Sequence, residues 1–169
     1  MSANQQDLST AVVTGGSRGI RRAVAIALVR QGWNVCLSYN SNKKAADETL
    51  SGIHTVGRRA LAVQADIANR EDISRLFESA YKAFGRFDAL VNKCRNCQRA
   101  AFDSGRGRRL PDRGFQHQCD RQFLSRQRGG LAPIGRAGTA DEVAQVVAFH
   151  AGPLSSFMHG ALVDGYGGR

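Results

Sequence analysis

The sequence is poor in cysteine and has no long apolar run, and each shortage excludes a class of protein. Four cysteines in 169 residues do not indicate the disulfide framework of a small secreted domain. No stretch approaches the ~18 apolar residues of a membrane helix. The polar start, MSANQQDLST, lacks the basic-then-apolar pattern of a secretion signal. We therefore expect a cytoplasmic protein that does not enter a membrane.

Basic residues exceed acidic ones, and the excess is concentrated in one segment. The net charge is +10, and residues 93–130 hold ten Lys/Arg and three Asp. The rest of the chain is nearly balanced, with fourteen basic and eleven acidic residues. Residues 93–130 also show no hydrophobic period, so they divide the chain into residues 1–92, 93–130 and 131–169.

Residues 1–92 alternate between strand-like and helix-like patterns. The expected strands are 10–14, 34–39, 60–66 and 87–92, and the expected helices are 19–32, 43–53 and 70–85. Such alternation predicts a parallel sheet with covering helices. After the basic segment, residues 139–152 predict a helix with a capping box of Thr139 and Glu142 and with Val143, Val146 and Val147 on one apolar face. Residues 160–165 predict a last strand.

A glycine-rich stretch, VVTGGSRGIRRAVA, lies where the first expected strand turns into the first helix. Backbone N–H groups and a helix N-terminus meet at such a turn, and glycine lets a pyrophosphate approach the backbone. Its place after the first strand of the series makes this signal much stronger than glycines alone.

The stretch resembles the loop of the short-chain dehydrogenases/reductases, T-G-x-x-x-G-x-G. Thr14, Gly15 and Gly19 match, whereas Arg21 stands in place of the third glycine and should crowd the loop. Further matches follow in the family's order, and they cover residues 1–92 and about 131–169: ADI (65–67), DALVN (88–92), APIGRAGTADEVAQVVAF (132–149) and GALVDGYGG (160–168).

The resemblance implies an α/β protein with a Rossmann-like, doubly wound parallel sheet and a dinucleotide cofactor. The residues expected to bind the cofactor are Gly15, Ser17, Arg18, Gly19, Ile20, Asn40, Ser41, Asp66, Ile67 and Asn92. NAD enzymes usually carry a carboxylate after the second strand, but this strand ends SYNSNKK. Because Asn40, Ser41, Lys43 and Arg18 could accept a 2′-phosphate, NADP is favoured over NAD.

The match breaks directly after Asn92, where the family's N-N-A-G-I is replaced by N-K-C-R-N-C. Residues 92–98 can be written with the codons AAC AAA TGC CGG AAT TGT CAG, and discarding one A after Asn92 would then restore N-N-A-G-I-V. Residues 114–130 can likewise be written with codons that, shifted by one base, read V-F-N-T-N-V-I-G-S-F-L-V-A-S-E-A, which resembles the family's N-V-x-G helix. We therefore interpret residues 93–130 as an out-of-frame translation, with the frame recovered near Leu131 after a deletion.

The family's catalytic Ser and its Tyr-x-x-x-Lys pair have no match, so the sheet is expected to be incomplete, without its central strands and catalytic helix. The pair Tyr39 and Lys43 has the right spacing but lies after the second strand, at the adenosine end of the site. Tyr81 and Tyr166 have no lysine four residues later. By resemblance the function is NADP-dependent hydride transfer between an alcohol and a carbonyl, with no catalytic residue assigned and an inactive chain expected.

Other interpretations remain open at this point. Cys94, Cys97, His117 and Cys119 could bind zinc, but their spacing matches no strong pattern, and we assign no metal site. The basic segment 93–130 could bind nucleic acid, although no known module surrounds its phenylalanines. The chain could also be a non-functional remnant. An unpaired edge at strand 87–92 would favour homo-oligomers or aggregation.

Overall fold

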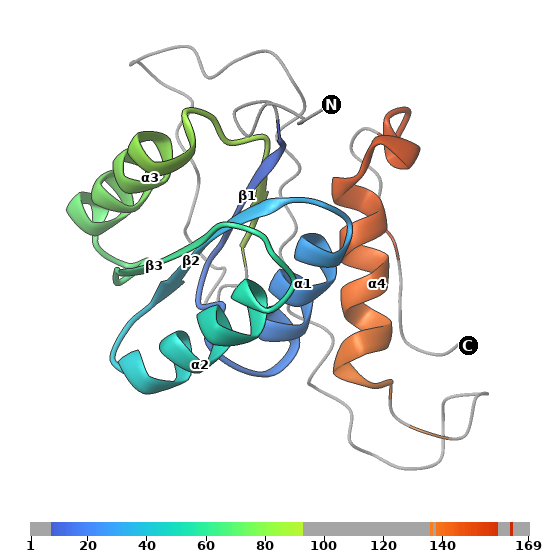
Figure 1. Ribbon diagram of the computed structural model, residues 1–169, viewed down its shortest axis with the longest axis horizontal. Helices are drawn as coiled ribbons and strands as arrows, with labels where there is room; N and C mark the ends of the chain where they lie inside the picture. The colour runs from blue at the N-terminus through green and yellow to red at the C-terminus, as the bar shows by residue number, and fades with distance from the viewer. Residues whose placement is uncertain (1–7, 93–135, 137, 159–162, 164–169) are drawn as a thin grey trace.

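The computed structural model describes residues 8–92, 136, 138–158 and 163, and its ribbon is drawn in Figure 1. Through β4 the described chain alternates strands with helices, as the sequence predicts. The elements are β1 (Thr10–Val13), α1 (Gly19–Arg30), β2 (Asn34–Tyr39), α2 (Lys43–His54), β3 (Ala60–Gln64), α3 (Arg70–Phe84), β4 (Ala89–Val91), α4 (Ala140–Ala151) and the 3-10 helix η1 (Pro153–Ser155).

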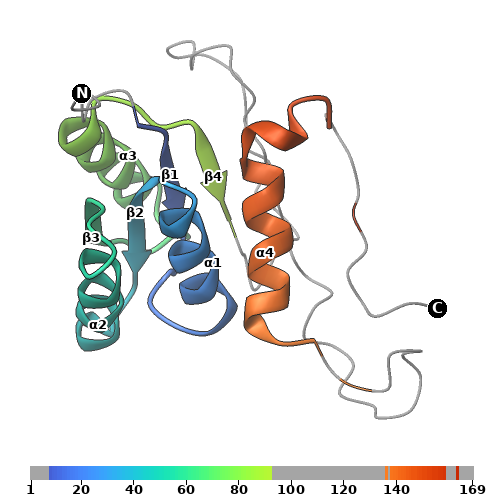
Figure 2. The same cartoon turned by 45° about the vertical axis from the view of Figure 1, so that its right-hand side comes forward.

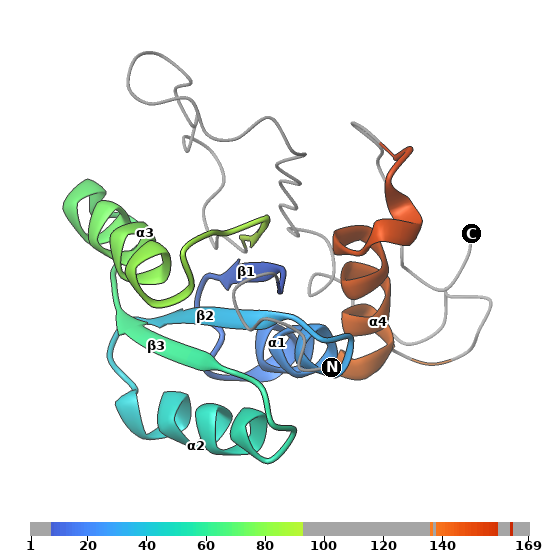
Figure 3. The same cartoon turned by 45° about the horizontal axis from the view of Figure 1, so that its top comes forward.

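The described strands form one parallel sheet in the order β3-β2-β1-β4. Val12 of β1 pairs with Cys36 of β2 and with Leu90 of β4, so β1 is central among the described strands. Figure 3 shows α3 on one face of this sheet and α1 and α2 on the other. Helix α4 packs beside α1, and the view in Figure 2 places it next to β4. This is the Rossmann-like α/β arrangement that the sequence predicts.

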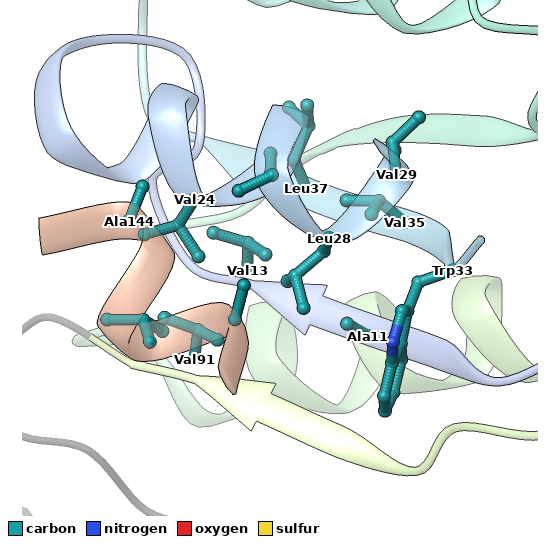
Figure 4. Close-up of a cluster of buried hydrophobic side chains, with 14 of the residues drawn as sticks. Ala11, Val13, Val24, Leu28, Val29, Trp33, Val35, Leu37, Val91 and Ala144 are labelled. Carbon is teal, nitrogen blue, oxygen red and sulfur yellow. The ribbon is translucent and has the colours of Figure 1, made fainter. Parts of the chain in front are cut away.

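Every residue of β1 and β2 is buried, so both faces of these two strands are covered, and neither strand alternates between buried and exposed side chains. From β1, Ala11 and Val13 join the hydrophobic cluster under α1, α2 and α4, whereas Val12 joins the cluster under α3. Leu37 and Cys36 of β2 divide in the same way. Figure 4 shows the first cluster closing between α1, α4 and the sheet.

Polar signals fix where the later helices begin and end. The Asn42 and Asn69 side chains accept backbone N–H groups at the starts of α2 and α3, and Gly85 ends α3 with a φ of 77°. The expected capping box of Thr139 and Glu142 is present at the start of α4. Arg136 donates a hydrogen bond of 2.9 Å to Glu142, and this bond, with others from Thr139, lowers the pKa of the Glu142 carboxyl from 4.5 to about 2.

Several boundaries and one face differ from the sequence-based expectation. The expected strand 60–66 already ends at Gln64, and the expected strand 87–92 is shortened at both ends, to Ala89–Val91. Val146 was expected on the buried face of α4 but is exposed, because Ala144 and Ala148 face α1 instead. The segment 93–130 and most of the expected strand 160–165 lie outside the described residues, as do Cys94, Cys97, His117, Cys119 and Tyr166.

Nothing in the described part of the chain forms a helix with the length and apolar character needed to cross a membrane. Cys36 of β2 is fully buried, and this burial raises the pKa of its thiol to about 12. A thiol in this state behaves as a small apolar side chain.

Small residues let α4 approach α1 closely. Ala148 is fully buried at this contact, whereas Gln145 of the same helix is exposed. We predict that Ala148→Leu lowers the free energy of unfolding by about 1–3 kcal/mol, because the added methylenes have no space between the helices. Urea unfolding followed by circular dichroism measures this change. Gln145→Leu is the matched control and should change stability little; equal losses in both variants would contradict the packing described here.

Candidate functional site

The candidate site lies at the carboxyl ends of the described strands, where β1, β2 and β4 each release the chain into a loop. In a parallel sheet these ends meet at one edge, and ligands of open α/β sheets bind there. The loop from Thr14 to Arg18 leaves central β1 and enters α1. Asn40 and Ser41 follow β2, and Asn92 follows β4. The sheet therefore brings three of the predicted segments to the same edge.

Hydrogen bonds from both neighbouring strands fix the start of this loop. The Thr14 backbone N–H donates to the Val91 carbonyl at 3.0 Å, and its hydroxyl donates to Oδ1 of Asn92 at 2.8 Å. On the other side, the Gly15 N–H donates to the Ser38 hydroxyl and the Gly16 N–H to the Ser38 carbonyl, both at 3.0 Å. The amides of Thr14, Gly15 and Gly16 thus donate to acceptors of the protein itself.

The middle of the loop packs tightly against β2 and α2. A Cβ on Gly16 would lie 2.8 Å from Cβ of Leu37, so only glycine fits at this position without a shift of the strand. The Ser17 carbonyl accepts a buried hydrogen bond of 3.3 Å from the Thr49 hydroxyl of α2. Ser17 is itself buried. These contacts give the loop a fixed shape before any ligand is present.

The start of α1 differs from the starts of the other described α-helices. Helices α2, α3 and α4 each begin with a side chain that accepts a backbone N–H, whereas no side chain caps α1 at Arg18 and no acidic residue lies in its first turn. The first amides of a helix have no acceptor within the helix. Gly19 has a φ of +60°, and no atom of the non-neighbouring described residues lies within 4 Å of the place where its Cβ would stand. The helix start is therefore open to an anion.

The guanidinium of Arg21 crowds the same loop from the helix side. A Cβ on Gly15 would lie 2.3 Å from Nη1 and 2.8 Å from Cζ of Arg21. Gly15 has a φ of +62°. The Arg21 side chain thus covers Gly15, whereas no described side chain covers Gly19.

The loop after β2 carries exposed polar groups and no acidic side chain before α2. Asn40 and Ser41 are exposed, and the Asn40 carbonyl accepts from the Gln64 side chain at 2.9 Å. Lys43 pairs with Asp47 at 2.9 Å, and this hydrogen bond raises the lysine pKa. Lys43 is therefore already engaged by a carboxylate.

Asp66 and Ile67 lie farther from the glycine loop than the other predicted residues. They follow β3, which is separated from β1 by β2, so they are displaced by two strand spacings, roughly 10 Å. Asp66 is exposed, and its Oδ1 accepts the Ala68 N–H at 2.9 Å, which shapes the turn into α3. Ile67 is half-buried.

Within the described residues, Tyr39 and Lys43 have the Tyr-x-x-x-Lys spacing, but their side chains are not arranged for acid–base catalysis. Tyr39 is buried in the core at 8% exposure, and Lys43 faces Asp47, so the pair cannot act together on a substrate. Tyr81 lies exposed on α3. Among residues 8–92, 136, 138–158 and 163, no three His, Cys, Asp or Glu side chains gather as metal ligands.

Sequence reasoning missed three residues that shape the site: Gly16, Ser38 and Thr49. Each acts through a tertiary contact with a strand or helix distant in the chain, so no local pattern marks it. For Gly16, the second glycine of the TGG stretch was a signal in the sequence that could have been used.

A separate apolar cavity of about 340 Å³ is lined partly by Trp33 and Phe149. It lies at the amino end of β2, away from the carboxyl ends of the strands that hold the loop.

Comparison with known proteins gives a family-model match over residues 9–100, described as short chain dehydrogenase. An uncharacterized oxidoreductase of Methylorubrum extorquens is 45% identical over 82 residues, which are 48% of this chain and 33% of that protein. A hydroxynaphthalene reductase-like protein of Metarhizium guizhouense is 42% identical over 82 residues, 48% of this chain and 31% of that protein. The chain thus spans about a third of the length of these relatives.

Among solved structures, a dehydrogenase/reductase from Sinorhizobium meliloti is similar to this chain. It is 39% identical, with a TM-score of 0.49, and the match covers 52% of this chain and 36% of that one.

The close contact between Gly16 and Leu37 predicts a strict requirement for glycine in the loop. We expect Gly16→Ala to lower the free energy of unfolding by about 1–3 kcal/mol, because the methyl group would press on the β2 backbone position. Gly52→Ala, in α2 with no described neighbour within 4 Å of its Cβ position, is the matched control and should raise stability by ~0.5–1 kcal/mol. Urea unfolding of both variants checks the pair; a stabilised Gly16→Ala would refute the contact.

Proposed function

Because this chain belongs to the short-chain dehydrogenase family, we propose that its glycine loop binds a nicotinamide dinucleotide and that the preferred form is NADP. One observation carries the proposal. The start of α1 is the one described α-helix start with neither a capping side chain nor an acid, and it opens from a loop fixed to β2 and β4. A diphosphate supplies the negative charge that such a helix start favours.

The described residues fit the adenosine and diphosphate parts of such a ligand. The amides of Gly19 and Ile20 would hold the diphosphate, with Ser17 and Gly15 forming the wall of the loop. Asp66 and Ile67 would border the adenine, and Asn92 would lie toward the nicotinamide half. These roles follow the family resemblance and the shared sheet edge.

The charges around the end of β2 favour a phosphorylated ribose. Asn40 and Ser41 are exposed and neutral, and Arg18 is exposed at the start of α1. A carboxylate at this place would hold the two ribose hydroxyls of NAD and repel a 2′-phosphate. Arg18 would pair with that phosphate by a charge-assisted hydrogen bond.

The proposed chemistry is hydride exchange between an alcohol and a carbonyl, in which the nicotinamide, when bound, supplies or takes the hydride. A general acid or base must also move a proton at the substrate oxygen. Neither Tyr39, which is buried, nor Tyr81, which lies on α3, is placed for this role. We therefore propose that the chain as it stands binds the cofactor and does not turn over a small-molecule substrate. A cytoplasmic location and homo-oligomers remain part of this proposal.

We further propose that residues 93–130 are read out of frame, and that the three-part division of the chain follows from this. The segment follows Asn92, where the family pattern stops, and lies outside the described residues. No contact of the described residues favours the nucleic-acid alternative for it.

The frame hypothesis predicts the coding DNA. Sequencing should reveal codons for residues 92–98 that read N-N-A-G-I-V after the loss of one base, and the same shifted frame for residues 114–130. Synonymous codons that cannot produce these residues in the shifted frame would refute the hypothesis, whatever the cofactor result.

Cofactor binding is tested by titrating the full chain with NADPH and NADH and following nicotinamide fluorescence. We expect saturable binding of NADPH and weaker binding of NADH. Asn40→Asp should weaken NADPH binding about fivefold, because a carboxylate near 4 Å from the 2′-phosphate adds roughly 1 kcal/mol of repulsion in water.

Asn42→Asp is the matched control for this titration. It adds the same charge two residues later, but its side chain is turned to the Ala45 N–H at the start of α2, so NADPH binding should change less. Equal NADPH and NADH affinities, unaltered by Asn40→Asp, would contradict the NADP assignment. Measurable turnover of an alcohol or ketone would contradict the proposed inactivity.

A further inference from the structure

The glycine loop is partly filled by one of the protein's own side chains. The guanidinium of Arg21 stands directly over Gly15, so close that a Cβ there would be 2.3 Å from Nη1. Within the part of the chain that the structure describes, free space remains at Gly19: no side chain of another residue stands within 4 Å of the corresponding point. Gly15 in the loop and Gly19 at the start of α1 both have a positive φ, but they differ in their surroundings. The guanidinium of Arg21 covers Gly15, whereas no described side chain covers Gly19.

The geometry of α1 explains why Arg21 reaches this place. Arg21 is the third residue of α1, and helical side chains lean toward the N-terminus of their helix. Gly15 lies in the loop that enters this helix, six residues earlier in the chain. The side chain is half-buried, so its guanidinium rests against the loop rather than extending into water.

This placement matters because glycine in such a loop serves to let the ligand approach the backbone. The space that a missing Cβ leaves at Gly15 is here occupied by Nη1 and Cζ of Arg21. A ligand atom and a guanidinium atom cannot occupy the same volume. Ser38 and Val91 fix the loop from both sides, so the loop itself cannot move away to make room.

We propose that the Arg21 side chain competes with the dinucleotide for the glycine loop and thereby lowers the affinity of the site. The ligand binds when the guanidinium has left Gly15, and the side chain returns when the ligand dissociates. This inference rests on the proposed function, since it concerns the same loop.

The competition has a quantitative consequence. When only a fraction of the molecules has an uncovered loop, the apparent dissociation constant rises by the inverse of that fraction. A guanidinium that covers Gly15 in nine molecules out of ten would weaken NADPH binding about tenfold. Removing the side chain should restore that factor, even though it also removes a positive charge.

Arg21→Gly and Arg22→Gly form a matched pair for the test. Both replace an arginine in the first turn of α1, remove one positive charge and place one glycine in the helix, but only Arg21 stands over Gly15. The experiment titrates the full-length wild type and both variants with NADPH at one ionic strength, by nicotinamide fluorescence. Circular dichroism melts show that each variant is folded.

The expected result is an NADPH dissociation constant about tenfold lower for Arg21→Gly than for wild type, with no gain for Arg22→Gly. Binding by Arg21→Gly alone, with a silent wild type, also supports the inference while contradicting cofactor binding by the natural chain. If the wild type binds and Arg21→Gly binds no tighter than Arg22→Gly, the inference is wrong and the proposed function stands. If no protein binds, both are wrong.

Discussion

The site depends on how the chain is held where it leaves β1. Ser38 of β2 accepts the Gly15 and Gly16 amides with its hydroxyl and carbonyl oxygens, and Thr14 bonds to the end of β4. A loop that leaves a central strand has backbone groups that water cannot easily reach, and an unsatisfied buried amide costs free energy. These bonds satisfy the amides next to β1 and direct the chain into α1.

The direction of α1 then determines the electrostatics of the site. Helices α3 and α4 begin with capping side chains and acids, Glu71 and Asp72 in one and Asp141 and Glu142 in the other. Helix α1 begins with Arg18 and has no acid in its first turn, so positive side chains add to the positive end of its dipole. This arrangement is unfavourable for an isolated helix and favourable for a helix that meets an anion. Arg21 belongs to the same first turn, and its side chain leans back over Gly15, so attraction for the ligand and competition with it arise from one short stretch.

Much of the fold could be predicted from the sequence because its signals are local. The 3.6-residue spacing of Leu76, Ala80 and Phe84 marks the buried face of α3, and Gly85 marks its end. The capping box of Thr139 marks the start of α4 in the same way. The prediction for Val146 was wrong because the helical period of apolar residues does not define which side of the apolar face is buried. In the structure Ala144 and Ala148 join the buried cluster with α1, and Val146 is exposed.

The sequence by itself determined the order of strands and helices, the position of the glycine loop between β1 and α1, and the absence of an acid after β2. Each of these follows from hydrophobic period, turn residues and charge, which act over a few neighbouring residues. The tertiary structure alone decided that Ser38 holds the loop, that Gly16 must fit against Leu37, and that Arg21 covers Gly15. These contacts depend on distances between segments that only the pairing of β1 with β2 and the entry angle of α1 bring together, and a linear sequence does not contain those distances.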